Sequence, residues 1–301
     1  MDLETLTVFD QVVREGSFSK AAWRLELSQP TVSSRIKALE REVGVSLFVR
    51  GRKLALTEGG LSLLPHARAA LASYREGLEA ARLARGDRGR LAVGALRSLT
   101  GLFLAPVLAQ YYAQFPQVEC LVREGEHSQV VALLCDGIVE LALICWPCLS
   151  PPPTDLTPLL YLCETLVFVV PHRHPLAQRS SVTVEDVLAA AHPLLLLRWW
   201  QQTPTALSSL ASQVSSVADV STETGRFLLS QGVGMGFFPR MVIAQDLEAG
   251  RVVEVRLEGF SDLLRESALV RLNRSSPLSS AAAQFETLLR ARAQALDLWV
   301  G

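Results

Sequence analysis

Three short segments with helical apolar periodicity fill the first 44 residues, and they constrain the fold more than any other feature. Apolar side chains recur every three to four positions over residues 3–14, 18–25 and 29–43, which predicts three helices. Ser17 and Ser28 stand directly before the second and third segments, where a serine hydroxyl caps the first turn. Because a very short turn joins these two helices, we expect them to lie in contact.

The predicted third helix carries small, polar and basic side chains opposite its apolar stripe. Two short helices joined by a tight turn, the second with such a face, describe a helix-turn-helix, whose second helix enters the major groove of DNA. Small residues let the helix lie deep in the groove, while hydroxyl, amide and basic groups contact base edges and phosphates. The candidate DNA-binding residues here are Ser28, Gln29, Pro30, Thr31, Ser33, Ser34, Arg35 and Lys37. The alternative is a small helical domain with a solvated polar face.

Residues 47–56 predict two short strands around a basic turn. Arg50, Arg52 and Lys53 lie in this turn, which has the character of a wing. A basic wing places its cations against phosphates or in the minor groove. The first 58 residues therefore predict a domain that binds double-stranded DNA.

The charge balance differs between the two parts of the chain. Residues 1–90 contain 15 Lys and Arg against 11 Asp and Glu, whereas residues 91–301 contain 14 against 19. The net charge of −1 for all 301 residues conceals this division. Such asymmetry is typical of a basic module joined to an acidic one, although chance variation in composition explains it equally well.

The N-terminal sequence closely resembles the winged helix-turn-helix of LysR-type transcriptional regulators. The resemblance runs in order through Gly16–Ala22, Leu25, Leu27–Ser33, Ile36, Lys37, Leu39, Glu40, Gly44, Leu47, Phe48, Arg50, Leu56 and Thr57. The chain departs from the family at Ser34, where members often carry arginine, and its wing is slightly short. The resemblance implies a sequence-specific transcriptional regulator rather than an enzyme, one that acts as a homo-oligomer, either a dimer or a tetramer.

Residues 59–87 predict a long helix with a heptad seam. Leu64, Leu71 and Leu78 recur every seven residues, and Tyr74 follows Leu71 by three. A helix packed on its own domain often shows the same stripe. The family resemblance instead implies a dimerising linker with contacts at these four residues, which lets two recognition helices read a two-fold promoter site.

Strand and helix patterns alternate over residues 91–301, which predicts an α/β fold with parallel strands. The pattern resembles the effector-binding domain of the same family, a two-lobed fold similar to periplasmic binding proteins. The resemblance implies a first lobe over residues 91–163 and 269–301, a second lobe over residues 164–268, and a small-molecule effector bound between them.

Ligands in such folds bind beyond the carboxyl ends of strands and at helix N-termini. Ser98 follows the first predicted strand and best matches the position of effector contacts in the family, although ordinary helix capping is the alternative. Arg198 and the two tryptophans after it fit an aromatic or acyl carboxylate, unless the tryptophans pack in the core. The candidate effector-binding residues are Ser98, Leu99, Thr100, Trp146, Arg198, Trp199, Trp200 and Thr203.

Other functions were weighed against this interpretation. Cys145 and Cys148 have the spacing of a redox pair, so a redox-responsive regulator is one alternative. A solute-binding-type sensor without a DNA role is another. Since no signal peptide and no membrane-spanning apolar run is recognisable, we expect a cytoplasmic protein that contacts no membrane. No metal ion or cofactor is predicted.

Overall fold

The computed structural model describes residues 2–49, 54–84, 89–149, 156–190, 192–197, 201, 203–260, 263–272 and 277–298. The chain divides into two compact units, the first formed by Met1–Gly89 with Cys135–Ile138 and the second by Arg90–Leu134 with Val139–Gly301. Each unit has its own hydrophobic core. No helix in the described ranges combines the length and the apolar character that crossing a membrane requires.

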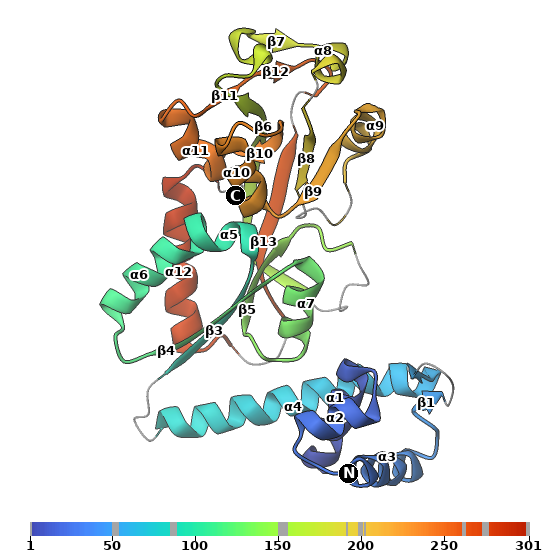
Figure 1. The fold of residues 1–301 in the computed structure, drawn as a ribbon. Helices are drawn as coiled ribbons and strands as arrows, with labels where there is room; N and C mark the ends of the chain where they lie inside the picture. Colours follow the sequence, from blue (N-terminus) through green and yellow to red (C-terminus); the bar gives the residue numbers. More distant parts are fainter. Residues whose placement is uncertain are drawn as a thin grey trace. The chain divides into compact units, whose positions relative to one another are not determined.

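Short helices, a hairpin and one long helix form the first unit (Figure 1). The elements are α1 (Leu3–Glu15), α2 (Phe18–Arg24), α3 (Gln29–Val43), β1 (Phe48–Val49), β2 (Ala55–Leu56) and α4 (Glu58–Ala84). The predicted caps are present, because the Ser17 and Ser28 hydroxyls accept hydrogen bonds from the first turns of α2 and α3. Gly44 ends α3 in the left-handed backbone region, which only glycine adopts without steric cost.

The hydrophobic core of the first unit contains side chains from α3, from the β1–β2 hairpin and from α4. Phe48 of β1 packs edge-on against Phe9 and Phe18, with ring centroids 5.6 Å apart in both pairs. Asp10 is buried in α1 and accepts hydrogen bonds from Arg14 Nε at 2.7 Å and Arg68 Nε at 2.8 Å. Since Arg68 belongs to α4, this buried carboxylate joins the long helix to α1.

The heptad residues of α4 divide into two groups, which corrects part of the predicted dimer seam. Leu71 is buried in the core of its own unit, and Leu64 packs against that core. Tyr74 and Leu78 are 50% and 43% exposed. The alternative of packing on the same domain therefore holds for Leu64 and Leu71, because α4 begins beside α1 and must cover its apolar face. Among these four residues, Tyr74 and Leu78 are the ones whose side chains are exposed and available to contact another subunit.

One sheet runs through the second unit in the order β10-β6-β13-β5-β3-β4, with β11 also paired to β6 (Figure 1). Its strands are β3 (Arg90–Leu96), β4 (Glu119–Gly125), β5 (Leu141–Cys145), β6 (Leu156–Pro171), β10 (Gly236–Pro239), β11 (Val252–Glu254) and β13 (Leu264–Leu272). β3 lies parallel to β4 and β5, as predicted. β13 and β6 run antiparallel to their neighbours, so the sheet is mixed.

β6 and β13 connect the two lobes of the second unit. β6 pairs with β13 over residues 156–165 and continues against β10 and β11 over residues 166–171. The sequence pattern predicts a strand only over Thr165–Val170, the apolar end of β6. Pro158 lies in the other end, next to a register shift in β13 that interrupts regular pairing.

Helices cover both faces of this sheet. The first lobe carries α5 (Arg97–Leu99), η1 (Thr100–Leu104), α6 (Ala105–Gln114), α7 (His127–Cys135) and α12 (Ser280–Ala295). The second lobe carries η2 (Pro175–Gln178), β7 (Ser181–Val182), α8 (Val184–Ala189), β8 (Leu194–Leu197), α9 (Thr205–Gln213), β9 (Val217–Val220), α10 (Thr222–Ser230), α11 (Arg240–Glu248) and β12 (Arg256–Leu257). Figure 1 draws α5, α10 and α11 on the left of β13, and α7 and α9 on its right.

Candidate functional site

The outer face of α3 presents short polar and basic side chains to solvent. Gln29, Pro30, Ser34 and Lys37 are exposed, and Ser33 is half-buried. These groups have the size and the hydrogen-bonding capacity that reading base edges and holding phosphates require.

The other predicted DNA-binding residues differ in role or are not described. Ser28 accepts a hydrogen bond from the Thr31 amide at 3.3 Å, and the two hydroxyls lie 2.7 Å apart, so both form the cap of α3. Arg35 forms an ion pair with Glu4 of α1 at 2.8 Å, which holds its guanidinium toward the body of the domain. The predicted wing residues Arg50, Arg52 and Lys53 lie outside the described residues.

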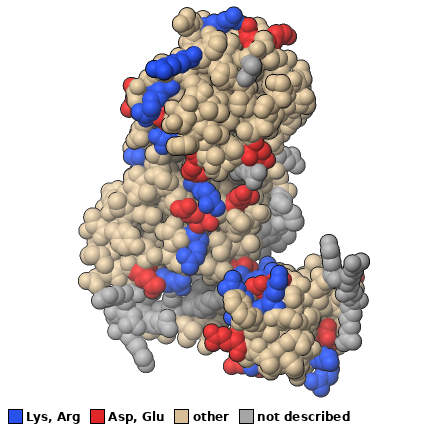
Figure 2. Space-filling model, viewed as in Figure 1, with Lys and Arg blue, Asp and Glu red and all other residues tan. Residues whose placement is uncertain are grey.

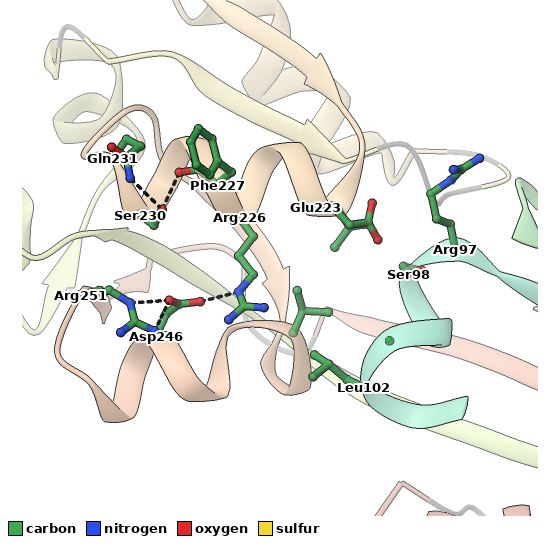
Figure 3. A pocket seen from close by; sticks show the side chains of 13 residues that line it. Arg97, Ser98, Leu102, Glu223, Arg226, Phe227, Ser230, Gln231, Asp246 and Arg251 are labelled. Carbon is green, nitrogen blue, oxygen red and sulfur yellow. Dashed lines mark hydrogen bonds and ion pairs between the residues drawn. The ribbon is translucent and has the colours of Figure 1, made fainter. Parts of the chain in front are cut away.

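A cavity of about 550 Å³ lies between the two lobes of the second unit, within the usual range for small-molecule sites (Figure 3). The residues that line it are Arg97, Ser98, Gly101, Leu102, Thr222, Glu223, Arg226, Phe227, Ser230, Gln231, Val242, Asp246 and Arg251. The first four come from α5 and η1 of the first lobe, and the remainder come from α10, α11 and the turns that follow them. A ligand in this cavity therefore contacts both lobes.

A buried carboxylate organises the second-lobe side of this cavity. Asp246 of α11 accepts hydrogen bonds from Arg226 Nε at 2.5 Å and from Arg251 Nε at 2.6 Å. Burial alone raises the pKa of Asp246, but the hydrogen bonds and charges of the two arginines outweigh it and hold this pKa below its usual value. The carboxylate therefore stays ionised and fixes Arg226 at the edge of the cavity.

A chain of polar contacts leads from the cavity through the strands that connect the lobes. Arg265 of β13 donates a hydrogen bond from Nη1 to Ser98 Oγ at 3.0 Å and forms an ion pair with Glu164 of β6. Glu164 in turn accepts a hydrogen bond from the Met241 amide at 3.2 Å, in the first turn of α11. Ser98 in the first lobe is thus linked to a second-lobe helix that lines the same cavity.

Of the predicted effector residues that the structure describes, only Ser98 lines this cavity. Leu99 is buried in the first-lobe core, and Thr100 is buried with its hydroxyl bonded to the Leu96 carbonyl at 3.2 Å, so neither side chain lines the described cavity. The reason is helical geometry, because successive side chains of α5 and η1 point about 100° apart and those after Ser98 turn inward. Arg198, Trp199 and Trp200 lie outside the described residues.

Trp146 and Thr203 lie elsewhere in the second unit. Trp146 packs edge-on against Tyr161 with ring centroids 5.9 Å apart, and Thr203 is exposed. Gln201 joins the two lobes nearby, since its Oε1 accepts a hydrogen bond from the Leu149 amide and its Nε2 donates one to the Pro147 carbonyl, both at 2.7 Å. Neither Trp146 nor Thr203 lines the described cavity.

The charged residues of the cavity have little local sequence signal that predicts them. Arg97, Glu223, Arg226, Asp246 and Arg251 come from separate elements and meet only in the folded chain. The one available signal is the polar face of α10, on which Glu223, Arg226 and Ser230 lie at helical spacing.

The cysteine pair does not have the properties of a reactive thiol site. Burial raises the pKa of Cys145 to about 11, and burial also raises the pKa of Cys148. Cys148 Sγ lies 3.5 Å from His127 Nε2, and burial lowers the pKa of this histidine. Both groups are therefore neutral near pH 7, so the dyad contains no thiolate–imidazolium pair.

Comparisons with known proteins agree on one family. The family model described as "LysR substrate binding domain" matches residues 84–294, and that of "Bacterial regulatory helix-turn-helix protein, lysR family" matches residues 3–61. The HTH-type transcriptional regulator AlsR of Bacillus subtilis is 32% identical over 249 residues, which cover 79% of this chain and 80% of AlsR.

Solved structures show the same fold over nearly the whole chain. ArgP from Mycobacterium tuberculosis aligns with a TM-score of 0.66 at 25% identity, covering 100% of this chain and 99% of that one. A variant of full-length OxyR from Pseudomonas aeruginosa aligns with a TM-score of 0.64 at 23% identity, covering 96% and 98%, which shows the shared fold alone. The chain belongs to the LysR-type transcriptional regulators, with a helix-turn-helix N-terminus and a two-lobed effector-binding domain.

Proposed function

We propose that this regulator reads a two-fold promoter site as a homo-oligomer, with α3 of each subunit in the major groove. The supporting observation is the exposed face formed by Gln29, Ser34 and Lys37, beside the half-buried Ser33. Basic and acidic side chains lie interspersed on the drawn face of the second unit (Figure 2). We therefore assign phosphate attraction to the first unit, in which residues 1–90 carry the basic excess.

We further propose that a small-molecule effector binds in the cavity beside Ser98 and changes the angle between the lobes. The cavity carries this proposal, because it is lined from both lobes and joined to β6 and β13 through Arg265. An effector shifts a conformational equilibrium only by its difference in affinity for the two states. A ligand that contacts both sides of the cavity has such a difference.

The effector is an organic acid in this proposal. Three arginines against two acidic residues line the cavity, and Leu102, Val242 and Phe227 supply apolar surface for the rest of the molecule. This composition supports an effector that combines a carboxylate with an apolar part, bound by residues other than Arg198 and the neighbouring tryptophans. The redox alternative has no comparable support, because both thiols of the Cys145 and Cys148 pair are protonated near neutral pH.

The recognition helix is tested by replacing Ser33 and Lys37 together with alanine. Neither side chain belongs to the buried core, so the fold should persist while specific binding to the native promoter is lost. Replacing the exposed Arg256 of the second unit with glutamine is the matched control, which should bind like the wild type. Retention of nanomolar promoter binding by the double variant would refute the assignment of α3.

The effector site is tested by Ser98→Trp, which fills the cavity and breaks the contact with Arg265. The expected result is normal DNA binding without a response to the effector, measured by anisotropy of labelled promoter DNA. Thr203→Trp is the control, since Thr203 is exposed and does not line the described cavity. A response that survives in Ser98→Trp and disappears in Thr203→Trp would move the effector to the side of the domain near Gln201.

A further inference from the structure

Glu223 and Arg226 present opposite charges to the cavity from one face of α10. They are three residues apart, a spacing at which side chains on a helix are neighbours and often pair with each other. Arg226 instead donates its hydrogen bond to Asp246 at 2.5 Å. Within the described part of the chain, Glu223 has no ion pair. Figure 3 shows Arg226 next to Asp246, and Glu223 between Arg226 and the first-lobe side of the cavity.

An unpaired carboxylate in a ligand cavity selects against simple anions. A monocarboxylate that approached Arg226 would also approach Glu223, and its binding would remove water from Glu223 without supplying a counter-charge. Since Glu223 is exposed, a second negative charge beside it is disfavoured mainly by like-charge repulsion, by which a site selects against a ligand. A ligand with adjacent charges of both signs meets Arg226 and Glu223 together.

We propose that the cavity binds an α-amino acid with an apolar side chain. This inference rests on the proposed function of the cavity and specifies its ligand. The α-carboxylate pairs with Arg226, the α-ammonium group pairs with Glu223, and the side chain packs against Leu102 and Val242. Since α-amino acids carry their two charged groups on one carbon, their spacing suits two side chains one helical turn apart.

The first lobe completes this site. Arg97 lines the cavity from α5, and Figure 3 draws it on the first-lobe side of Glu223, away from Arg226. Gly101 lines the cavity from the same lobe, and a Cβ atom added at this position would meet no other atom within 4 Å. A side chain added at Gly101 therefore starts in open space at the cavity, where its Cβ atom displaces no neighbouring atom.

The test is calorimetric titration of the full-length protein with leucine, methionine, phenylalanine and tryptophan, and with 4-methylpentanoate and 3-phenylpropionate as amine-free analogues. At least one amino acid should bind, and its amine-free analogue should bind at least about tenfold more weakly. Glu223→Gln should abolish this preference, whereas Arg256→Gln should preserve it. Equal binding of an amino acid and its analogue to the wild type, or failure of all four amino acids to bind, would overturn the proposal.

The location is tested with a matched pair of variants at Gly101. Gly101→Leu should abolish amino-acid binding, and Gly101→Ala should retain it, because the leucine side chain extends further into the cavity than the alanine methyl group. Binding that persists unchanged in Gly101→Leu would overturn the assignment to this cavity.

These experiments distinguish failure of the amino-acid inference from failure of the proposed effector function. If amine-free acids bind in the cavity and alter DNA affinity, the function stands and the amino-acid inference fails. If amino acids bind as described and DNA affinity never changes, the inference stands and the effector function fails.

Discussion

Replacing Glu164 with glutamine should destabilise the second unit strongly, because it removes a buried negative charge that pairs with the buried Arg265. Arg265 is 1% exposed and Glu164 is 6% exposed, so water screens neither group. Glutamine retains an oxygen that accepts the Met241 hydrogen bond, and the substitution therefore removes the negative charge alone. Removal of one member of a buried ion pair costs about 3–5 kcal/mol.

The assay is thermal unfolding followed by circular dichroism. For a domain of this size, each kcal/mol lowers the midpoint by about 2–4 °C, so the expected decrease is about 6–20 °C. The double variant Glu164→Leu with Arg265→Met should recover most of the loss, since an apolar replacement of both members is often neutral. A decrease of less than about 2 °C in the single variant would refute the reasoning that this pair is isolated from solvent.

Three further predictions concern other parts of the chain. Burial lowers the pKa of His174, so as the pH falls the unfolded state binds a proton before the folded state does, and the protein loses stability below pH 6.5. His174→Asn should therefore reduce this loss of unfolding free energy in a pH series. An unchanged dependence of the unfolding free energy on pH would contradict this. Cys145 has a pKa of about 11, which leaves little thiolate at pH 7.5. It should therefore react with iodoacetamide at least about 300-fold more slowly than an ordinary cysteine, as followed by mass spectrometry. Rapid alkylation of Cys145 in the folded protein would contradict this. Leu71→Ala should lower the unfolding free energy by about 2–5 kcal/mol in urea titrations. Leu78→Ala should mainly weaken self-association, as measured by sedimentation. Loss of self-association in Leu71→Ala and loss of stability in Leu78→Ala would instead place Leu71 in the dimer seam.

The parts of the fold that follow from local sequence were predicted well. The caps at Ser17 and Ser28 and the three helices α1, α2 and α3 all depend on residues adjacent in the chain. The N-terminal half of β6 was missed, because Pro158 disfavours a strand unless a partner strand with a register shift accommodates it.

The candidate site was predicted only where it is local. Ser98 follows β3 directly, and the rule that ligands bind beyond strand ends identified it. Its partner Arg265 lies 167 residues further along the chain, and a pairing over that distance leaves no periodic signal. Arg226 and Asp246 are likewise brought together by the packing of α10 on α11. Leu99 and Thr100 were assigned to the site from sequence proximity, whereas the rotation of the helix places them in the core.

The heptad pattern of α4 shows a second limit of sequence reasoning. An apolar residue every seven positions indicates that one side of the helix is covered, but not what covers it. Leu71 is covered by the core of its own unit, and Tyr74, less than one turn later, is exposed. The same stripe therefore serves packing within the unit at one end and accessible surface at the other.

The most direct test of the central claim is the affinity of the full-length protein for its own promoter DNA, measured by fluorescence anisotropy with and without a ligand found by thermal-shift screening. The account predicts that the ligand changes the affinity of the wild type and of Gly101→Ala by about fivefold or more. It also predicts that Gly101→Leu binds DNA like the wild type and does not respond to the ligand. A ligand response in Gly101→Leu equal to that of the wild type would contradict the claim that an effector between the lobes controls DNA binding.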